Sequence, residues 1–409
     1  MTDPVARRLV FHVAGYDPMS AETAHHRFTR ELARFRATWG VSAQAGPLTL
    51  EDDVATWPVE AQGPDWSVAA EVRWLRWEEV MARLHAMSTP QRLLRGFATF
   101  ADFIRAGALR HYVRHNWRYA LFFVYPAFQV FLFAAIGALV GWGAALLSGW
   151  AWLGIGAGVA AFAGILQWAR RRTRLDHLFD DWIFAREQVR NPDPGLAARL
   201  ERIAQEIVAV ARAGEVDEVL VLGHSLGAVL AVEIVDRALA RDPMLGTHGT
   251  AVSFATVGSS IPKLGFHGGA ERLRGMLARV GGASHVTWVD YQAHADVMNF
   301  HKLHPVRGLG AGERGPLVRL VSIRRMLDEA YYRDIRTNLL RVHNQFVSGN
   351  QARCIYDYFM LVCGPRTLET LGRAGEGAAD CLAPDGSLVR PAPSGYVARA
   401  GLDRLPASP

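Results

Sequence analysis

The chain has 409 residues, half of them hydrophobic, which is enough for one large α/β domain with an insertion. Its formal net charge of +6 comes almost wholly from arginine, since lysine occurs only at Lys263 and Lys302. Because the basic residues form no patch interleaved with aromatic residues, we expect no nucleic-acid partner. The cysteines, Cys354, Cys363 and Cys381, lack metal or redox-pair spacing, and their odd number favours a reducing compartment.

The N-terminal part of the chain is predicted to alternate strands and helices. The expected strands are residues 9–13, 54–61 and 66–75, and the expected helices are residues 20–39 and 78–87. No uninterrupted apolar core of a signal peptide precedes the first strand. Residues 90–115 then place leucine and phenylalanine on one side and arginine on the other. This pattern fits a helix lying in a membrane interface and equally a surface helix of a soluble domain.

A long uncharged segment follows. Between Arg118 and Arg170 there are 51 residues without a charge, which as one helix would measure about 76 Å against a hydrocarbon core of about 30 Å. Two passes fit this length, so we expect a transmembrane hairpin of residues 119–147 and 150–168; the alternative is a buried helical hairpin in a soluble core. We expect the two helices to contact each other at the glycines of the G-x-x-x-G spacings, Gly137, Gly141, Gly154 and Gly158. The aromatic residues expected at the membrane interfaces are Tyr119, Trp150, Trp152 and Trp168.

The arginines around this segment predict its orientation. They lie on both outer flanks and not in the connecting segment 147–153; the flanking residues are Arg105, Arg110, Arg114, Arg118, Arg170, Arg171, Arg172 and Arg174. Positively charged flanks stay on the cytoplasmic side. We therefore expect an integral protein of the inner (cytoplasmic) membrane whose remaining domain faces the cytoplasm.

Beyond the hairpin the pattern returns to alternating strands and helices. The expected helices are residues 176–190, 196–213 and 271–280, and the expected strands are residues 219–222, 251–257, 285–291 and 317–323. This alternation predicts an α/β fold with a mostly parallel, doubly wound sheet. The predicted organisation is one domain in two parts, 1–115 and 176–365, interrupted by the hairpin 116–175 and followed by an irregular tail, 366–409.

The segment 218–235 carries the strongest functional signal. An apolar strand leads into Gly223-His224-Ser225-Leu226-Gly227, and helical spacing follows, which is the arrangement of a G-x-S-x-G nucleophile elbow. Small residues two before and two after the serine let strand and helix pass closely. A Gly-rich turn with a buried serine is the alternative. The segment resembles the α/β-hydrolase superfamily, and GHSLG resembles its lipase and esterase members in particular.

This resemblance implies a set of catalytic residues. Ser225 would be the nucleophile, and the N–H of Leu226 at the start of the helix would stabilise an oxyanion. A second N–H would come from the loop after the first strand, from Gly15 or Tyr16. Here the sequence departs from the family, whose His-Gly directly follows the strand; a plain strand-to-helix turn is the alternative.

The acid and the histidine of a triad follow the serine in the α/β-hydrolase order. We expect Asp296 as the acid, with Asp290 as the alternative. His343 is expected as the base because it follows the last predicted strand; His294, His301 and His304 are the other C-terminal candidates. His224 is expected to pack beside the elbow.

Together these features predict a membrane-anchored serine hydrolase that cleaves an ester or thioester through an acyl-enzyme on Ser225. The expected partners are the lipid bilayer and an ester or lipid-like substrate. The sequence leaves open an acyltransferase with the same triad and a non-enzymatic membrane scaffold on the same fold. No residue cluster has metal-ligand spacing and no dinucleotide fingerprint occurs, so we expect neither metal nor cofactor.

Overall fold

A computed structural model describes residues 4–390 of the chain. These residues divide into two compact units. The first combines the residues up to Val80 with those from Pro192 onward and contains the sheet. The second runs from Met81 to Asn191 and is helical. The fold is therefore α/β, and the helical unit is an insertion between two parts of the sheet-containing unit.

Nine strands form a single mixed sheet in the first unit. They are β1 (Arg7–Val13), β2 (Ser42–Ala45), β3 (Thr49–Leu50), β4 (Val54–Gln62), β5 (Ser67–Leu75), β6 (Glu218–His224), β7 (Ala251–Val257), β8 (Thr287–Ala293) and β9 (Leu317–Val321). The order is β2-β4-β5-β1-β6-β7-β8-β9, with β3 on β4. Strands from β5 to β9 are parallel, whereas β2, β3 and β5 pair antiparallel with β4. The mostly parallel sheet predicted from the alternation is confirmed.

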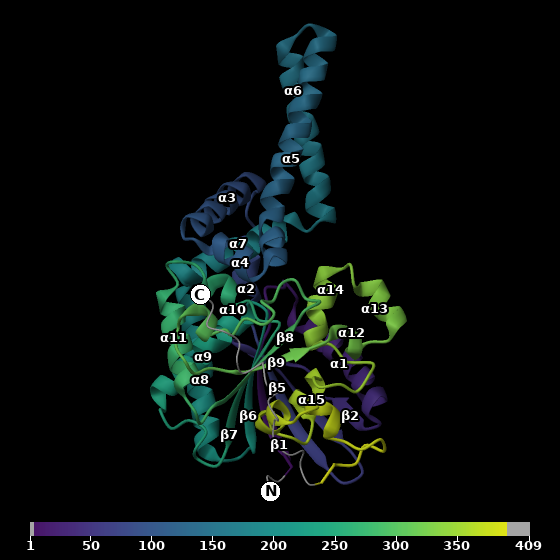
Figure 1. Cartoon of the computed structure of the whole chain (residues 1–409), viewed down its shortest axis with the longest axis vertical. Coiled ribbons are helices and arrows are strands. Elements are labelled where there is room, and N and C mark those ends of the chain that lie inside the picture. The colour runs from purple at the N-terminus through teal and green to yellow at the C-terminus, as the bar shows by residue number, and fades with distance from the viewer. Residues whose placement is uncertain (1–3, 391–409) are drawn as a thin grey trace. The chain divides into compact units, whose positions relative to one another are not determined.

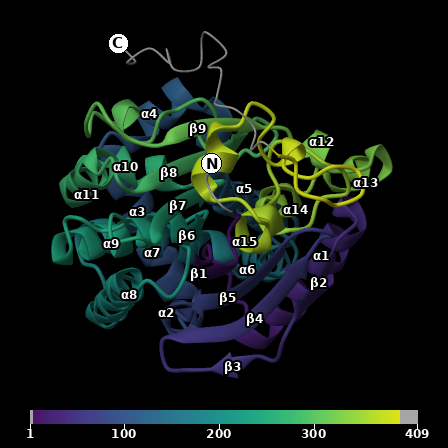
Figure 2. The same ribbon diagram turned by 90° about the horizontal axis from the view of Figure 1, so that it is seen from below.

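Helices cover both faces of the sheet (Figures 1 and 2). One face carries α8 (Pro194–Ala213), α9 (Gly227–Arg241) and α11 (Glu271–Gly282), and the other carries α1 (Ala21–Trp39), α15 (Tyr358–Cys363) and α16 (Leu368–Arg373). Shorter helices lie in the connections: α10 (Ile261–Gly265), α12 (Ile323–Met326), α13 (Glu329–Ile335) and α14 (Leu339–Asn344), with 3-10 turns at Arg307–Leu309, Gln345–Val347 and Gly377–Asp380.

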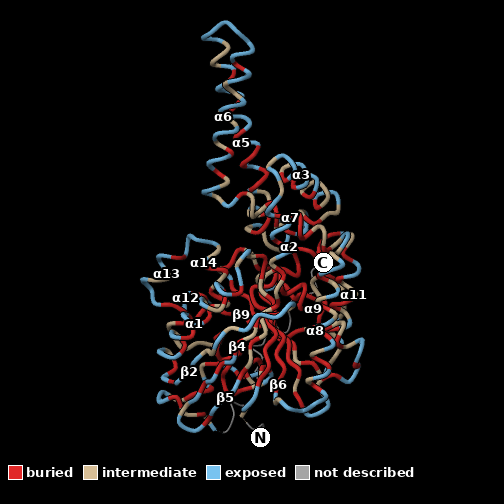
Figure 3. The backbone as a smooth tube through the Cα atoms, turned by 180° about the vertical axis from the view of Figure 1, so that it is seen from behind, coloured by how far each residue is buried: buried red, intermediate tan, exposed pale blue. Residues whose placement is uncertain are grey.

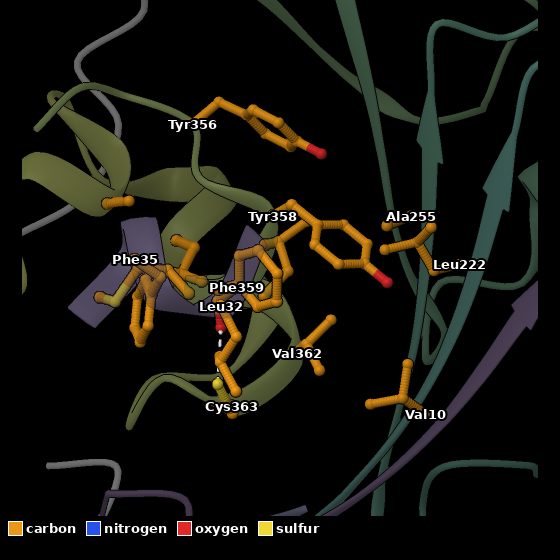
Figure 4. Close-up of a cluster of buried hydrophobic side chains, with 14 of the residues drawn as sticks. Val10, Leu32, Phe35, Leu222, Ala255, Tyr356, Tyr358, Phe359, Val362 and Cys363 are labelled. Atoms are coloured by element: carbon orange, nitrogen blue, oxygen red, sulfur yellow. Dashed lines mark hydrogen bonds between the residues drawn. The ribbon is translucent and has the colours of Figure 1, made fainter. Parts of the chain in front are cut away.

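The main hydrophobic core lies between α1, α15 and the sheet (Figure 4). Phe35 from α1 and Phe359 from α15 have ring centroids 5.8 Å apart. Tyr358 and Val362 point toward the strands that carry Val10, Leu222 and Ala255, as Figure 4 shows. This core fixes α1 and the C-terminal segment against the central strands β1, β6 and β7.

The segment 366–390, the first part of the expected tail, packs against the sheet and is mostly irregular outside α16 and a 3-10 turn. It contains α16, and its residues Leu368, Leu371, Cys381 and Leu388 are buried. A buried arginine explains the attachment: Arg8 forms an ion pair of 2.7 Å with Glu218 and donates to the Gly364 and Arg366 carbonyl oxygens. Because this contact is between residues distant in sequence, local periodicity did not reveal it. Residues 391–409 of the expected tail lie outside the described residues.

The helical unit is dominated by two apolar helices, α5 (Trp117–Ser148) and α6 (Ala151–Arg172), which run side by side (Figure 1). Both are long and apolar enough to cross a membrane. Gly149 ends α5 in the left-handed conformation, as the predicted break requires. Most of the large apolar residues on these helices are exposed, and much of both helices has the pale blue of exposed residues in Figure 3.

The remaining helices of this unit pack around the base of the hairpin. They are α3 (Thr89–Arg105), α4 (Ala108–His115) and α7 (Leu175–Arg190), preceded by α2 (Glu78–His85) at the unit boundary. The one-sided segment 90–115 is thus two helices, because Gly107 adopts a φ of 80° between them. Arg92 and Asp180, both buried, form an ion pair of 2.7 Å that joins α3 to α7.

Candidate active site

The predicted catalytic residues gather where the order of strands reverses. From β1 the chain proceeds to β5 and β4 on one side, and later to β6, β7, β8 and β9 on the other. In open α/β sheets ligands bind at such a switch point, beyond the carboxyl ends of the strands. The loops that follow β1 and β6 meet at this point, and they contain Gly15 and Ser225.

Ser225 has an unusual backbone conformation. Its φ is +54°, in the left-handed region that a residue with a side chain rarely adopts. Backbone hydrogen bonds hold it there: its N–H donates to the Val257 oxygen at 3.2 Å, and its own oxygen accepts from Ser260 N–H at 3.0 Å. The half-buried Ser225 therefore stands at a strained turn between β6 and α9.

The glycines of the turn have the roles expected from their spacing. A Cβ on Gly223 would lie 2.6 Å from the Ala228 Cα in α9. A Cβ on Gly227 would overlap the carbonyl oxygens of Val13 and Ala14 at the end of β1. The close passage of strand, loop and helix thus excludes side chains at both positions.

Two segments supply candidate oxyanion donors. Leu226 precedes α9, and no side chain caps the N-terminus of this helix. Backbone N–H groups at a helix N-terminus lack an acceptor within the helix and are available to an oxyanion. Gly15 lies against the serine: a Cβ placed on it would be 2.8 Å from the Ser225 Cβ and 3.3 Å from its Oγ. The Tyr16 ring is turned toward Trp77, with ring centroids 6.0 Å apart.

His343 and Asp296 form a buried pair. The Nδ1 of His343 lies 2.7 Å from Oδ2 of Asp296, and both side chains are almost completely buried. The other Asp296 oxygen accepts from Met298 N–H at 2.9 Å. Asp296 lies in the loop directly after β8, and His343 is in α14, which follows β9 after α12 and α13. With Nδ1 bound to the acid, Nε2 is the free basic position of the ring.

The Nε2 atom of His343 is buried and has no hydrogen-bond partner among residues 4–390. The hydrogen bond to Ser225 that the role of a base requires is thus not formed in this conformation. The His343 ring instead packs on His224, with centroids 4.7 Å apart, and its Cε1 would be 3.2 Å from a Cβ on Gly258. In ligand-free enzymes such catalytic hydrogen bonds are often long or misaligned and tighten when substrate binds.

Asp290, the alternative acid, belongs to a different network. It lies within β8 and accepts from Thr256 Oγ1 at 2.5 Å and from Gln292 Nε2 at 2.7 Å. Burial raises the pKa of Asp290 to about 6. Of the two acids, Asp296 is therefore the one that contacts His343.

The alternative histidines serve the loop after β8. His304 Nδ1 accepts from the N–H groups of Val306 and Arg307, and burial lowers the pKa of His304 to about 4. The rings of His294 and His301 pack against each other with centroids 5.2 Å apart. Of the C-terminal candidates, His343 is the one whose ring packs on His224 of the elbow.

Two further histidines, His12 and His224, lie beside the site. The sequence indicated no role for His12. His12 in β1 is bound through Nδ1 to the Tyr358 hydroxyl at 2.7 Å. Burial, and then the charge of Arg27, lower the pKa of His12 to about 3. Burial, followed by the charges of His343, His12 and Arg27, lowers the pKa of His224 well below its usual value. Both rings are therefore neutral at physiological pH. His224 packs beside the elbow as expected.

No group of three or more His, Cys, Asp or Glu side chains in the described residues is arranged to hold a metal ion. Comparisons of the chain with protein-family models, with curated proteins and with solved structures give no match.

Proposed function

We propose that the protein is a serine hydrolase of the α/β-hydrolase superfamily that cleaves an ester or thioester. The observation that carries the proposal is the left-handed conformation of Ser225 at the end of β6. A strained serine between a parallel strand and a helix is the hallmark of a nucleophile elbow, where the turn exposes Oγ above the sheet. The chain order of serine, aspartate and histidine agrees with this superfamily.

The geometry supports acyl transfer by a conventional triad. Ser225 Oγ attacks the carbonyl carbon while His343 Nε2 takes its proton. Asp296 accepts the Nδ1–H bond of His343, which holds the tautomer with a basic Nε2 and stabilises the imidazolium. The N–H of Leu226, with a donor from the Gly15-Tyr16 loop, binds the oxyanion of the tetrahedral intermediate.

The intermediate then collapses to an acyl-enzyme. The carbon–oxygen or carbon–sulfur bond breaks, and the leaving alcohol or thiol receives the proton from His343. A water molecule gives a proton to His343 and attacks the acyl carbon. Return of that proton to Ser225 Oγ releases the acid.

We further propose that α5 and α6 span the cytoplasmic membrane and anchor the enzyme. Their length, their apolar composition and the exposure of their large side chains support this. Because the arginines flank both outer ends of the hairpin, both ends belong on the cytoplasmic side. We propose a lipid-like ester as the substrate class, because the membrane beside the enzyme would supply it.

Fluorophosphonate labelling tests the chemistry. The wild-type protein should be labelled, and Ser225→Ala should not, with an unchanged circular dichroism spectrum. Ser322→Ala is the matched control, because Ser322 is an exposed serine outside the site. Labelling that is equal in Ser225→Ala and wild type refutes the nucleophile, and absence of labelling in all three supports the non-enzymatic scaffold.

Extraction and accessibility test the anchor. The protein should stay with the membrane fraction in alkaline carbonate, and cysteines placed at either end of the hairpin should react only with reagents that enter the cytoplasm. Release by carbonate, or ends on the outer face, contradicts the topology.

A further inference from the structure

Arg27 lies beside the candidate active site. It belongs to α1, which begins shortly after the loop that places Gly15 against Ser225. Its Nη2 donates to the Asn344 carbonyl oxygen at 3.2 Å and to the Ser348 hydroxyl at 3.3 Å. Because Asn344 follows His343 directly, the guanidinium lies next to the segment that carries the candidate base.

The charge of Arg27 is not neutralised by contact. Within residues 4–390 no carboxylate lies at ion-pair distance from Arg27, and its Nε and Nη1 groups have no acceptor. Arg8 shows the opposite arrangement, since it is buried with Glu218 at 2.7 Å and donates to two carbonyl oxygens. The Nε and Nη1 atoms of Arg27 are not among the fully buried donors without a partner, so these two groups are accessible to a ligand as well as to solvent.

Two carboxylates, Asp17 and Glu31, favour the charge of Arg27 through space, but neither forms an ion pair with it. Glu31 is the partner of Arg30 and Arg34 and also accepts from Gly349 N–H. Asp17, in the loop before α1, acts on Arg27 only at longer range. The neighbouring His12 and His224 are neutral, so Arg27 is the one full positive charge among these groups of the described site.

We propose that Arg27 binds an anionic group of the substrate, a phosphate or a carboxylate, close to the scissile ester. The guanidinium offers planar N–H donors that match the oxygens of either group, and such charge-assisted bonds are among the strongest in proteins. This inference rests on the proposed hydrolase and narrows its substrate to an acyl ester that carries a negative charge.

A purely structural role of Arg27 predicts a different outcome. If Arg27 only tethers Asn344 and Ser348, its loss disturbs His343 and slows every ester alike. If it binds an anion, its loss selectively slows the charged ester. The ratio of the two rates separates these roles.

The first experiment compares p-nitrophenyl butyrate with mono-p-nitrophenyl succinate, which adds a carboxylate to the acyl chain. Wild type should have the higher kcat/KM for the succinate ester. Arg27→Gln should lower the ratio of succinate to butyrate kcat/KM by about 10- to 100-fold. Arg27→Lys, which keeps the charge without the planar fork, should fall between them. An unchanged ratio in Arg27→Gln overturns the inference.

Arg36→Gln is the matched control, since Arg36 is an exposed arginine on the same helix. Its ratio should equal that of wild type. If Arg27→Gln does not fold, as judged by circular dichroism, the ratio in Arg27→Lys decides, and an unchanged ratio there refutes the role of the fork.

The second experiment does not depend on turnover. Inorganic phosphate, and separately succinate, should raise the Tm of the full-length protein in detergent for wild type and Ser225→Ala, but not for Arg27→Gln. The more effective anion identifies the preferred group. A Tm shift without ester turnover or labelling refutes the hydrolase and leaves the anion site standing. Turnover of the neutral ester without either an anion-dependent Tm shift or a changed ratio refutes the anion site alone.

Discussion

Glycines permit close backbone contacts in both units of the molecule, but the two sets have different consequences. At the elbow, Gly15, Gly223 and Gly227 bring a loop, a strand and a helix together around Ser225. In the hairpin, a Cβ on Gly141 would lie 2.7 Å from the Gly154 oxygen. The predicted close helix approach through the G-x-x-x-G spacings is thus present.

The two sets of glycines differ in the side chains that lie next to the close backbone contacts. Around Ser225 the backbone is crowded on several sides, and the one polar side chain at the apex is held in a strained conformation. Between α5 and α6 the close contacts are made by the backbone at Gly137, Gly141, Gly154 and Gly158, and a polar contact, from Thr173 to Gln129, lies at the end of α6. Close packing therefore holds the proposed nucleophile in place in one unit and associates two helices in the other.

The largest expected effect is on the chemistry at the elbow. Asp296→Asn should lower kcat/KM for p-nitrophenyl butyrate by about 10⁴-fold, because Asn donates where Nδ1–H needs an acceptor and so favours the wrong tautomer. The Tm should change little, since the two side chains have nearly the same shape. Steady-state kinetics and a thermal melt in detergent measure both quantities.

Asp290→Asn is the control for that change and carries its own pH dependence. Burial raises the pKa of Asp290 to about 6, above its usual 3.8. The folded state then binds a proton that the unfolded state has lost, so this group's contribution to stability falls as pH rises from about 4 to about 6. Asp290→Asn should reduce the decline in Tm from pH 4 to pH 7 and retain most activity. Loss of activity equal to that of Asp296→Asn would show that the acids were assigned wrongly.

The next prediction tests the close packing of backbone around Gly227 at the elbow. Gly227→Ala should destabilise the protein by about 3 kcal/mol, because its Cβ would overlap the carbonyl oxygens of Val13 and Ala14. Gly275→Ala in α11 is the comparison, since its Cβ would make only an ordinary contact of 3.4 Å and alanine favours the helix. Denaturant melts that rank the two variants equally would contradict the close packing at the elbow.

A smaller effect is expected in the hairpin. Gly141→Leu should cost about 1–2 kcal/mol, because the side chain would push α5 away from Gly154 and Gly158. Gly143→Leu lies on the same helix, where a Cβ would meet nothing within 4 Å, and should be neutral. Thermal melts of the two variants in detergent measure the difference. Equal Tm values would mean that the small-residue seam does not stabilise the hairpin.

The smallest effect has the opposite sign. Ser225→Gly should raise stability by about 0.5–1 kcal/mol, because glycine adopts a positive φ without the cost borne by a residue with a Cβ. Ser225→Ala keeps the Cβ and should give no such gain. The Tm of the two inactive variants, compared with wild type, measures the strain stored at the elbow.

The sequence predicted the parts of this fold that depend on local pattern. The strands β1, β4, β5, β6 and β7, and the helices α1, α5, α6, α7 and α8, lie within a few residues of the expected ranges. Apolar runs, turn residues and helical spacing are properties of a few neighbouring residues, and they suffice for such elements.

Features that depend on distant contacts were not predictable in the same way. The short edge strands β2 and β3 pair only with β4 and have little pattern of their own. The segment 366–390 is held by Arg8 and Glu218 of the central strands, which no local signal indicates. In the candidate site, motif and chain order predicted Ser225, Asp296 and His343. That Asp296 and not Asp290 contacts His343 depends on the path of the loop after β8, which the sequence does not reveal. Nothing in the sequence around Arg27 indicated that it lies beside the candidate site.

The pairing of β1 with β6 has a consequence for biosynthesis. Arg8 and Glu218 are 210 residues apart, and the helical unit is translated between the two strands. At about 5–20 residues per second, β1 waits on the order of 10–40 s before its partner emerges from the ribosome. During this interval β1 has an open edge that can pair with other chains. We therefore expect the yield of folded protein to fall when translation between β5 and β6 is slowed.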